Sequence, residues 1–404
     1  IAQRMFEGMN SFALLAIPLY TFAGFTMSKG GISKRLMDFC YSIVGHIYGG
    51  LAHVNVLSSM IFAGISGSAV ADTAGVSGMF MPEMVRKGYS KNFTVAVTAI
   101  SSTIGIIIPP SIPMVVIAGI CGISTGKLFL GGIIPGILCG LAQMIVSYLL
   151  AKKEGVPKEP GHFTIGPVLH GLWESWPALL MPIIIVGTIS NEHVNLFNTY
   201  TIFIIVGTIT MGIVSPTEAG VIAVVYGLFA GGIIYRELKW EDIKFAFAET
   251  VRTSGRIFIV IGAAKLYTVM LTTAGFDKWV AKTMLGFSTN PTVILIVILL
   301  IFFIVTMFME SIATLTLFMP ILYPIALGVG INPIVLSVLI TVVIGVGLVT
   351  PPVGMCIYVA CDLMDVTVGE VFPTLVPFIA ATFVCIALMV AFPQLILLPT
   401  YLMA

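Results

Sequence analysis

Charge is scarce along this chain. Only 9% of its 404 residues are charged, whereas 58% are hydrophobic. A soluble domain does not bury so large an apolar fraction, so the composition excludes a soluble globular protein. The net charge of +1 by itself indicates no nucleic-acid partner.

Patterns that carry common catalytic chemistry are also missing from the sequence. It contains no phosphate loop, no nucleotide-binding fingerprint and no nucleophile with an assembled base. The six cysteines are scattered among apolar residues without metal-ligand spacing, so we interpret them as small buried hydrophobes. We therefore expect neither an enzyme nor transport driven by ATP within this chain.

Long apolar runs are what the sequence does contain. They lie at 11–28, 92–123, 128–151, 177–189, 201–235, 257–274, 292–309, 332–361 and 371–398. Most of them are long enough to cross a hydrocarbon layer of ~30 Å as helices. This pattern predicts an all-α polytopic membrane protein.

The chain repeats itself at an interval of about 240 residues. "LFMP" at 317–320 echoes "MFMP" at 79–82, and "VTPPVGMCIYVAC" at 349–361 echoes "IIPPSIPMVVIAG" at 107–119. Two further echoes occur in the same order. The halves therefore share one structural plan.

Basic loops predict the topology of that plan. Loops near Lys34 and near Arg86 can both be cytoplasmic only if the segment between them enters and leaves on one side. This makes 47–85 a re-entrant hairpin, with "GISGSAVADTAG" at 64–75 as its tip. The matching hairpin at 290–330 enters from the opposite, periplasmic face, with its tip near 308–314. Inverted repeats with paired hairpins are typical of transporters whose binding sites lie near the midplane.

After each hairpin comes an apolar helix interrupted by a double proline, at Pro109 and at Pro351. Carbonyl groups freed by such a break cannot face lipid, so they must line a cavity, pack on protein or coordinate something. Small hard cations prefer oxygen ligands, and serine and threonine hydroxyls are abundant beside both breaks. Two quasi-equivalent Na⁺ sites follow as a hypothesis. The alternative is that these small residues only let helices pack closely.

A few ionisable residues stand out. Asp72 lies in the first tip, where a carboxylate is costly unless paired or solvated, so it is either functional or a cap on the returning helix. Arg252, at the start of an apolar helix, is a candidate for meeting an anionic substrate. Glu310, at the second tip, is either a counter-ion or a structural acid bonded to helix-end amides.

Several of these motifs together resemble one family. "GISGSAVADTAG", "GIIIPPSIPMVVIAG", "PTEAG", "LFMPILYPIA" and "VTPPVGMCIYVAC" resemble the large membrane subunit of TRAP (tripartite ATP-independent periplasmic) transporters. The resemblance implies a multi-pass protein of the bacterial inner membrane that imports an organic anion, such as a C4-dicarboxylate or sialic acid, with a Na⁺ gradient. It also implies two partners, a periplasmic substrate-binding protein and a small four-helix membrane subunit.

The resemblance further implies an inverted-repeat, elevator-type transporter and places the predicted sites. Substrate-binding residues would be Ser66, Ser68, Asp72 and Arg252. Cation ligands would be drawn from Ser66, Gly67, Ser102, Thr103, Gly105 and Pro109 in the first site, and from Glu310, Ser311, Thr314, Gly345, Gly347, Thr350 and Pro351 in the second.

A division of the chain follows from repeat and resemblance together. Scaffold or arm segments are expected at 1–35 and 251–276, a linker with scaffold helices at 152–250, and the two transport-domain halves at 36–151 and 277–404. A helix is expected to precede residue 1, and about twenty residues near 190–209 look inserted relative to the family pattern. Two alternatives for function remain open: a Na⁺/organic-anion symporter that needs no binding protein, and an ion channel.

Overall fold

The computed structural model describes residues 2–10, 12–156, 164–189 and 216–401, and every regular element among them is a helix. The elements of the first part are α1 (Ala2–Met9), η1 (Phe12–Leu15), α2 (Ala16–Lys29), α3 (Ile32–Val44), α4 (Gly50–Ser66), α5 (Ala69–Arg86), α6 (Lys91–Ser102), η2 (Thr103–Ile106), α7 (Ile112–Cys121), α8 (Thr125–Glu154) and α9 (Ile165–Ile189). The second part contains α11 (Pro216–Phe229), η3 (Ala230–Ile234), α12 (Trp240–Thr273), α13 (Phe276–Phe287), α14 (Pro291–Thr306), α15 (Ser311–Gly328), α16 (Pro333–Gly347), α17 (Met355–Met364), α18 (Val368–Ala391) and α19 (Gln394–Tyr401).

Among the described residues, five helical stretches are long and apolar enough to cross a membrane. They are Thr125–Glu154, Thr217–Ile234, Trp240–Thr273, Ser311–Gly328 and Val368–Ala391. The prediction of an all-α polytopic membrane protein is confirmed. The insertion expected near 190–209 falls within 190–215 and so lies outside the described residues.

The internal repeat is visible in the order and length of the helices. The series α4 to α8 is followed by the series α14 to α18, and each helix of the second series begins 241 to 243 residues after its counterpart. In each series the first two helices form a hairpin, and α4 with α5 and α14 with α15 pack against each other. The two predicted hairpins are therefore present.

The two series are interlocked rather than side by side. Helix α7 of the first series packs on α15 of the second hairpin, and α17 of the second series packs on α5 of the first hairpin. Such a reciprocal exchange is what a two-fold axis between the halves produces. Each hairpin is thus held by a helix from the other repeat.

Helices α6 and α16 form the centre of the molecule. Every residue from Phe93 to Ser102 and from Val335 to Gly347 is buried. Both helices begin with a polar N-cap, because the Ser90 hydroxyl accepts from the Phe93 amide at 3.1 Å and the Asn332 side chain accepts from the Ile334 amide at 2.9 Å. Both end just before a double proline, so the backbone opens at the most buried level of the fold.

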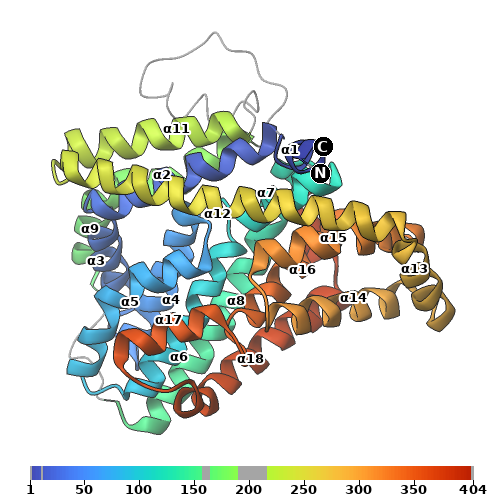
Figure 1. Ribbon diagram of the computed structural model, residues 1–404. Helices are drawn as coiled ribbons and strands as arrows, with labels where there is room; N and C mark the ends of the chain where they lie inside the picture. Colours follow the sequence, from blue (N-terminus) through green and yellow to red (C-terminus); the bar gives the residue numbers. More distant parts are fainter. Residues whose placement is uncertain (1, 11, 157–163, 190–215, 402–404) are drawn as a thin grey trace.

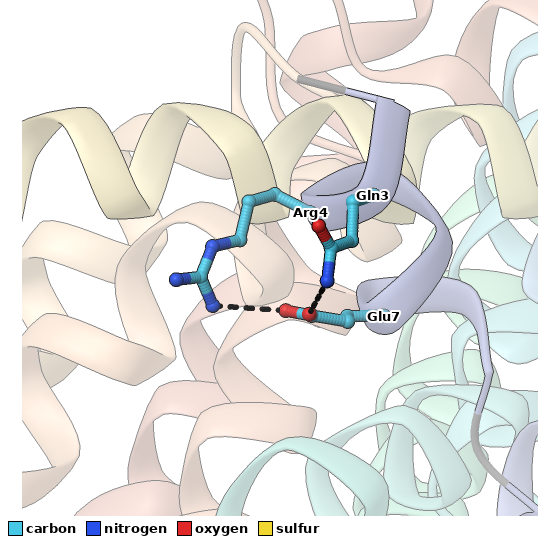
Figure 2. A network of polar contacts seen from close by, with 3 residues as sticks. All are labelled: Gln3, Arg4 and Glu7. Carbon is cyan, nitrogen blue, oxygen red and sulfur yellow. Dashed lines mark hydrogen bonds and ion pairs between the residues drawn. The ribbon is translucent and has the colours of Figure 1, made fainter.

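Helices α2, α11 and α12 run together along one edge of the molecule (Figure 1). The short helix α1 packs across α12, where a β-carbon on Gly8 would lie 2.6 Å from the β-carbon of Lys265. The outer face of α1 is polar. Figure 2 shows its Glu7 accepting from Gln3 at 3.4 Å and pairing with Arg4 at 2.9 Å.

Candidate functional site

The tip of the first hairpin is built around a glycine. Gly67 separates α4 from α5 with a φ of +64°, a left-handed conformation that favours glycine. A β-carbon there would lie 2.8 Å from the Pro110 carbonyl oxygen, and the Gly67 carbonyl accepts from the Ile112 amide at 3.2 Å. The tip is therefore docked on the backbone that follows the first double proline.

Asp72 lies in the first turn of α5 and is fully buried. The N-cap of this helix is Ser68, whose hydroxyl accepts from the Ala71 amide at 3.4 Å. Ser68 is therefore the N-cap of α5, and Asp72 lies one turn further along the helix. Its carboxylate instead lies against Gly105 in η2, where any β-carbon would collide with Oδ2.

Hydroxyl groups crowd the end of α6 beside this carboxylate. Ser102 donates to the Ala99 carbonyl at 2.7 Å and Thr103 donates to the Ile100 carbonyl at 2.7 Å. Thr73 donates to the Ala69 carbonyl at 2.9 Å. Because these hydroxyl protons are directed to backbone carbonyls, the oxygen lone pairs are what remains for a ligand.

The Thr73 and Ser102 hydroxyls have fewer protons than polar contacts. The Thr73 and Ser102 hydroxyl oxygens are 2.6 Å apart, and each also lies within hydrogen-bonding distance of a carbonyl. Two protons therefore serve three interactions, so the pair is rich in acceptors. Oxygen acceptors of this kind are the ligands that hard cations prefer.

The second hairpin repeats the backbone arrangement of the first. The Met307 carbonyl at its tip accepts from the Val353 amide at 3.0 Å, just after the second double proline. Gly347, at the end of α16, packs so closely that a β-carbon would lie 2.6 Å from that of Thr306. Thr350 donates to the Val346 carbonyl at 2.7 Å. As in the first half, the hydroxyl proton is directed to the backbone.

Glu310 is the N-cap of α15. Its carboxylate accepts from the amides of Ile312 at 2.8 Å and Ala313 at 3.3 Å, and from the Ser311 hydroxyl. Thr314 donates to the Glu310 carbonyl at 3.0 Å. Glu310 therefore bonds to helix-end amides, as the structural-acid alternative expects, and the N-terminus of a helix is a favourable place for a carboxylate.

The two predicted sites meet at the centre of the fold. Gly345 of α16 packs on Thr103, where a β-carbon would lie 3.2 Å from that of Thr103. The Cys356 thiol of α17 interacts with the hydroxyls of Thr73 and Ser102 and lies within electrostatic range of Asp72 and Glu310. Carboxylates from both hairpins thus act on one small region.

Of the remaining predicted residues, the two prolines lie in the helix breaks and Arg252 lies away from both tips. Arg252 lies on α12 with 66% of its side chain exposed, and its described partner is Glu249 at 2.6 Å rather than either tip. Pro109 and Pro351 each begin a cis Pro–Pro bond in the two breaks. Ser66 ends α4, and its side chain lies outside the described part of the structure.

Sequence reasoning missed two members of the site. Thr73 directly follows Asp72, yet only the structure shows its contact with Ser102. Cys356 lies beyond the second double proline, where its apolar neighbours in the sequence predict a small buried hydrophobe. It is buried, but its thiol faces hydroxyl groups. Among the described residues, no three His, Cys, Asp or Glu side chains gather into a metal cluster.

Comparison with solved structures supports the fold. The chain resembles the crystal structure of the Alcanivorax borkumensis YdaH transporter, described as having an unusual topology, with a TM-score of 0.63. The match covers 96% of this chain and 87% of that chain at 13% sequence identity. At this identity the likeness concerns the fold alone.

Sequence comparison is more specific. The chain is 34% identical over 397 residues to the sialic acid TRAP transporter large permease SiaM of Vibrio cholerae, covering 98% of this chain and 88% of that protein. It is 33% identical over 403 residues to the C4-dicarboxylate large permease DctM of Pseudomonas aeruginosa, covering 100% and 90%. The isethionate permease DctMQ of Oleidesulfovibrio alaskensis is 34% identical over 380 residues, and the chain spans 57% of its length.

A family model covers nearly all of the chain. Residues 1–395 match the DctM component of the tripartite ATP-independent periplasmic transporters. The large permeases of this family are multi-pass proteins of the bacterial inner membrane, in agreement with the membrane-spanning helices above. The chain belongs to this family of TRAP transporter large permease subunits.

Proposed function

We propose that this protein is the membrane permease of a Na⁺-coupled uptake system for an organic anion. The observation that carries the proposal is the set of hydroxyl and carbonyl oxygens at the end of α6, beside the first hairpin tip. Relatives named for sialic acid, C4-dicarboxylate and isethionate all take anions, which supports an anionic substrate.

Coupling has a physical reason in this arrangement. Each hairpin carries an acidic residue at its tip, Asp72 and Glu310, so we expect an anion to bind there only together with cations. The first cation site would use Gly67, Ser102, Thr103 and Gly105, and the second would use residues near Glu310, Gly345 and Thr350. Loading with cations and anion together then avoids the cost of moving unpaired charge through hydrocarbon.

The movement we propose is that of an elevator. The interlocked hairpins and central helices, with α7 and α17 exchanged between repeats, would move as one body. The edge helices α2, α11 and α12 would act as scaffold, in line with segments 1–35, 152–250 and 251–276 as scaffold and linker. A small membrane subunit would bind the scaffold, and a periplasmic binding protein would deliver the anion.

Proteoliposomes test this function. The permease, its small membrane subunit and the cognate binding protein are reconstituted, and uptake of labelled sialic acid, C4-dicarboxylates and isethionate is measured. We expect uptake of one anion class that requires both an inward Na⁺ gradient and the binding protein. Uptake that needs Na⁺ but no binding protein would support a two-component symporter instead. Flux that follows the anion's own gradient without Na⁺ would overturn the proposal in favour of a channel.

A further inference from the structure

A network of buried polar side chains lies behind the first hairpin, outside the residues assigned to the sites above. Asn55 of α4 donates to the Thr98 hydroxyl at 2.7 Å and accepts from the Ser101 hydroxyl at 3.2 Å. Ser59, one turn further along α4, donates to Ser101 at 3.1 Å. All four side chains have 0% exposure.

These contacts bracket the last turn of α6. Thr98 and Ser101 are three residues apart, so Asn55 and Ser59 hold one face of that turn from α4. From the other side, Gln143 of α8 donates to the Ile100 carbonyl at 3.3 Å. The turn is thus held by polar side chains of two different helices.

The turn held in this way leads directly into the first candidate cation site. Ser102 and Thr103 follow Ser101 immediately, and the Ile100 carbonyl bonded by Gln143 is the acceptor of the Thr103 hydroxyl. A movement of this turn would therefore move the oxygens offered to a cation. Hydrogen bonds in so buried a network are strong because the surrounding dielectric is low.

In the described part of the second repeat, the equivalent positions form no such network. At the tip-to-tip spacing of about 240 residues, Asn55 and Ser59 correspond to Leu295 and Leu299. At the spacing of the double prolines, Thr98 and Ser101 correspond to Ile340 and Val343. All four counterparts are buried apolar residues. The network is therefore not required to form the helical plan, which both repeats share.

We infer that Asn55, through Thr98 and Ser101, is a positioning residue that sets the Na⁺ affinity of the first site and leaves the second site unaffected. The inference rests on the proposed function, because it presumes that Na⁺ binds where Ser102 and Thr103 offer their oxygens. Asn55 would not contact the cation itself but would act through Thr98 and Ser101. Residues that orient the ligands of a metal site commonly contribute 10–100-fold to its affinity.

Binding of ²²Na⁺ to the purified permease complex tests the inference without knowledge of the anion. NaCl is titrated against choline chloride at constant ionic strength. We expect Thr98→Val, which removes the hydroxyl at nearly constant shape, to weaken one class of Na⁺ sites by about tenfold or more. The other class should keep its affinity. Thr98→Ser, which retains the hydroxyl, should bind both as the wild type does.

Two further variants complete the experiment. Asn55→Leu copies the second repeat and should weaken the same class as Thr98→Val; if it fails to fold, Thr98→Val decides alone. Thr341→Val is the matched control, because Thr341 is equally buried but donates only to the Ser337 carbonyl of its own helix, at 2.9 Å. It should leave both classes unchanged.

The outcomes separate the two proposals. Wild-type affinity for both classes in Thr98→Val, or an equal loss in both classes, would overturn the positioning role while leaving Na⁺ coupling intact. A wild-type complex that shows no saturable Na⁺ binding would overturn the proposed function, and this inference with it.

Discussion

The two hairpins share a backbone design but differ in what holds them. In both, a tip carbonyl accepts from an amide just beyond a double proline, at Gly67 with Ile112 and at Met307 with Val353. The first hairpin is also joined to α6 by side chains, through Asn55, Ser59 and Thr73. In the second, the described side-chain hydrogen bonds stay within the hairpin.

This difference shows what the repeat preserves. Backbone hydrogen bonds and glycine contacts define where each tip docks, and they occur in both halves. Side-chain hydrogen bonds determine how firmly the tip is held, and they differ between the halves. We therefore expect the first hairpin to be the stiffer of the two, with the second hairpin more able to open.

The largest expected effect is at Asp72. Asp72→Ala should lower Na⁺-driven uptake by about two orders of magnitude, because it removes a buried carboxylate beside the oxygens proposed to bind the first cation, and loss of a group that supports a metal site costs up to about 100-fold in affinity or activity. Asp72→Asn, which keeps the shape, should lose nearly as much if the charge is what matters. Initial uptake rates in proteoliposomes measure this. The control Asp362→Asn changes an exposed acid on α17 and should transport normally.

The next largest effect is expected when a methyl group is added to the glycine beside each helix break. Gly105→Ala would drive a methyl group into the Asp72 carboxylate, whereas Gly347→Ala would meet the Thr306 side chain at 2.6 Å. We expect both to slow uptake, Gly105→Ala by about tenfold more, because displacing a buried charge costs more than repacking a hydroxyl side chain. Gly75→Ala lies in open space and should be near neutral. Equal losses at Gly105 and Gly347 would mean that Asp72 has no special role.

Amide exchange tests the difference in stiffness directly. In the apo complex, amides of α14 should exchange about tenfold faster than those of α4, because several cross-helix bonds worth about 1 kcal/mol each hold only the first hairpin. Mass spectrometry of peptides covering 50–62 and 291–303 gives the ratio. Thr98→Val should reduce it, and equal protection in the wild type would contradict the comparison.

The smallest effect concerns the helix caps. Glu310 accepts from two amides, at 2.8 and 3.3 Å, whereas the Ser68 hydroxyl accepts from the Ala71 amide at 3.4 Å. Removing a cap typically costs about 0.5–2 kcal/mol. We expect Glu310→Ala to fray α15 toward the upper end of that range and Ser68→Ala to fray α5 toward the lower end, as measured by exchange in each first turn. Glu310→Gln should fall between wild type and alanine.

Much of the fold could be predicted from the sequence because membrane helices follow simple rules. Apolar runs, basic loops and the interval of about 240 residues predict multiple spans, two hairpins and two breaks, and the helices begin and end close to these positions. Gly67 and the double prolines mark the sharp changes of direction, since few other residues allow them.

The site was only partly predictable. The sequence predicts Asp72, Ser102 and Gly105 as site residues in two separate segments, and the structure brings those segments together. Thr73, Cys356 and the Asn55 network carry no motif, because a single hydroxyl, thiol or amide in an apolar helix looks like any small packed residue. The charge of Arg252 predicts a contact with an anionic substrate, whereas the structure places its side chain on an exposed face, paired with Glu249.

The sequence by itself determined the class of the protein, because a low charge content and long apolar runs leave few ways to satisfy the backbone other than spanning helices. It also determined the duplicated plan, since the motifs recur in order. Only the tertiary structure decided which polar groups meet: α17 of one repeat lies on the hairpin of the other, and Asn55 reaches α6. Those contacts depend on helix rotation and crossing, which are set by packing between segments far apart in the chain.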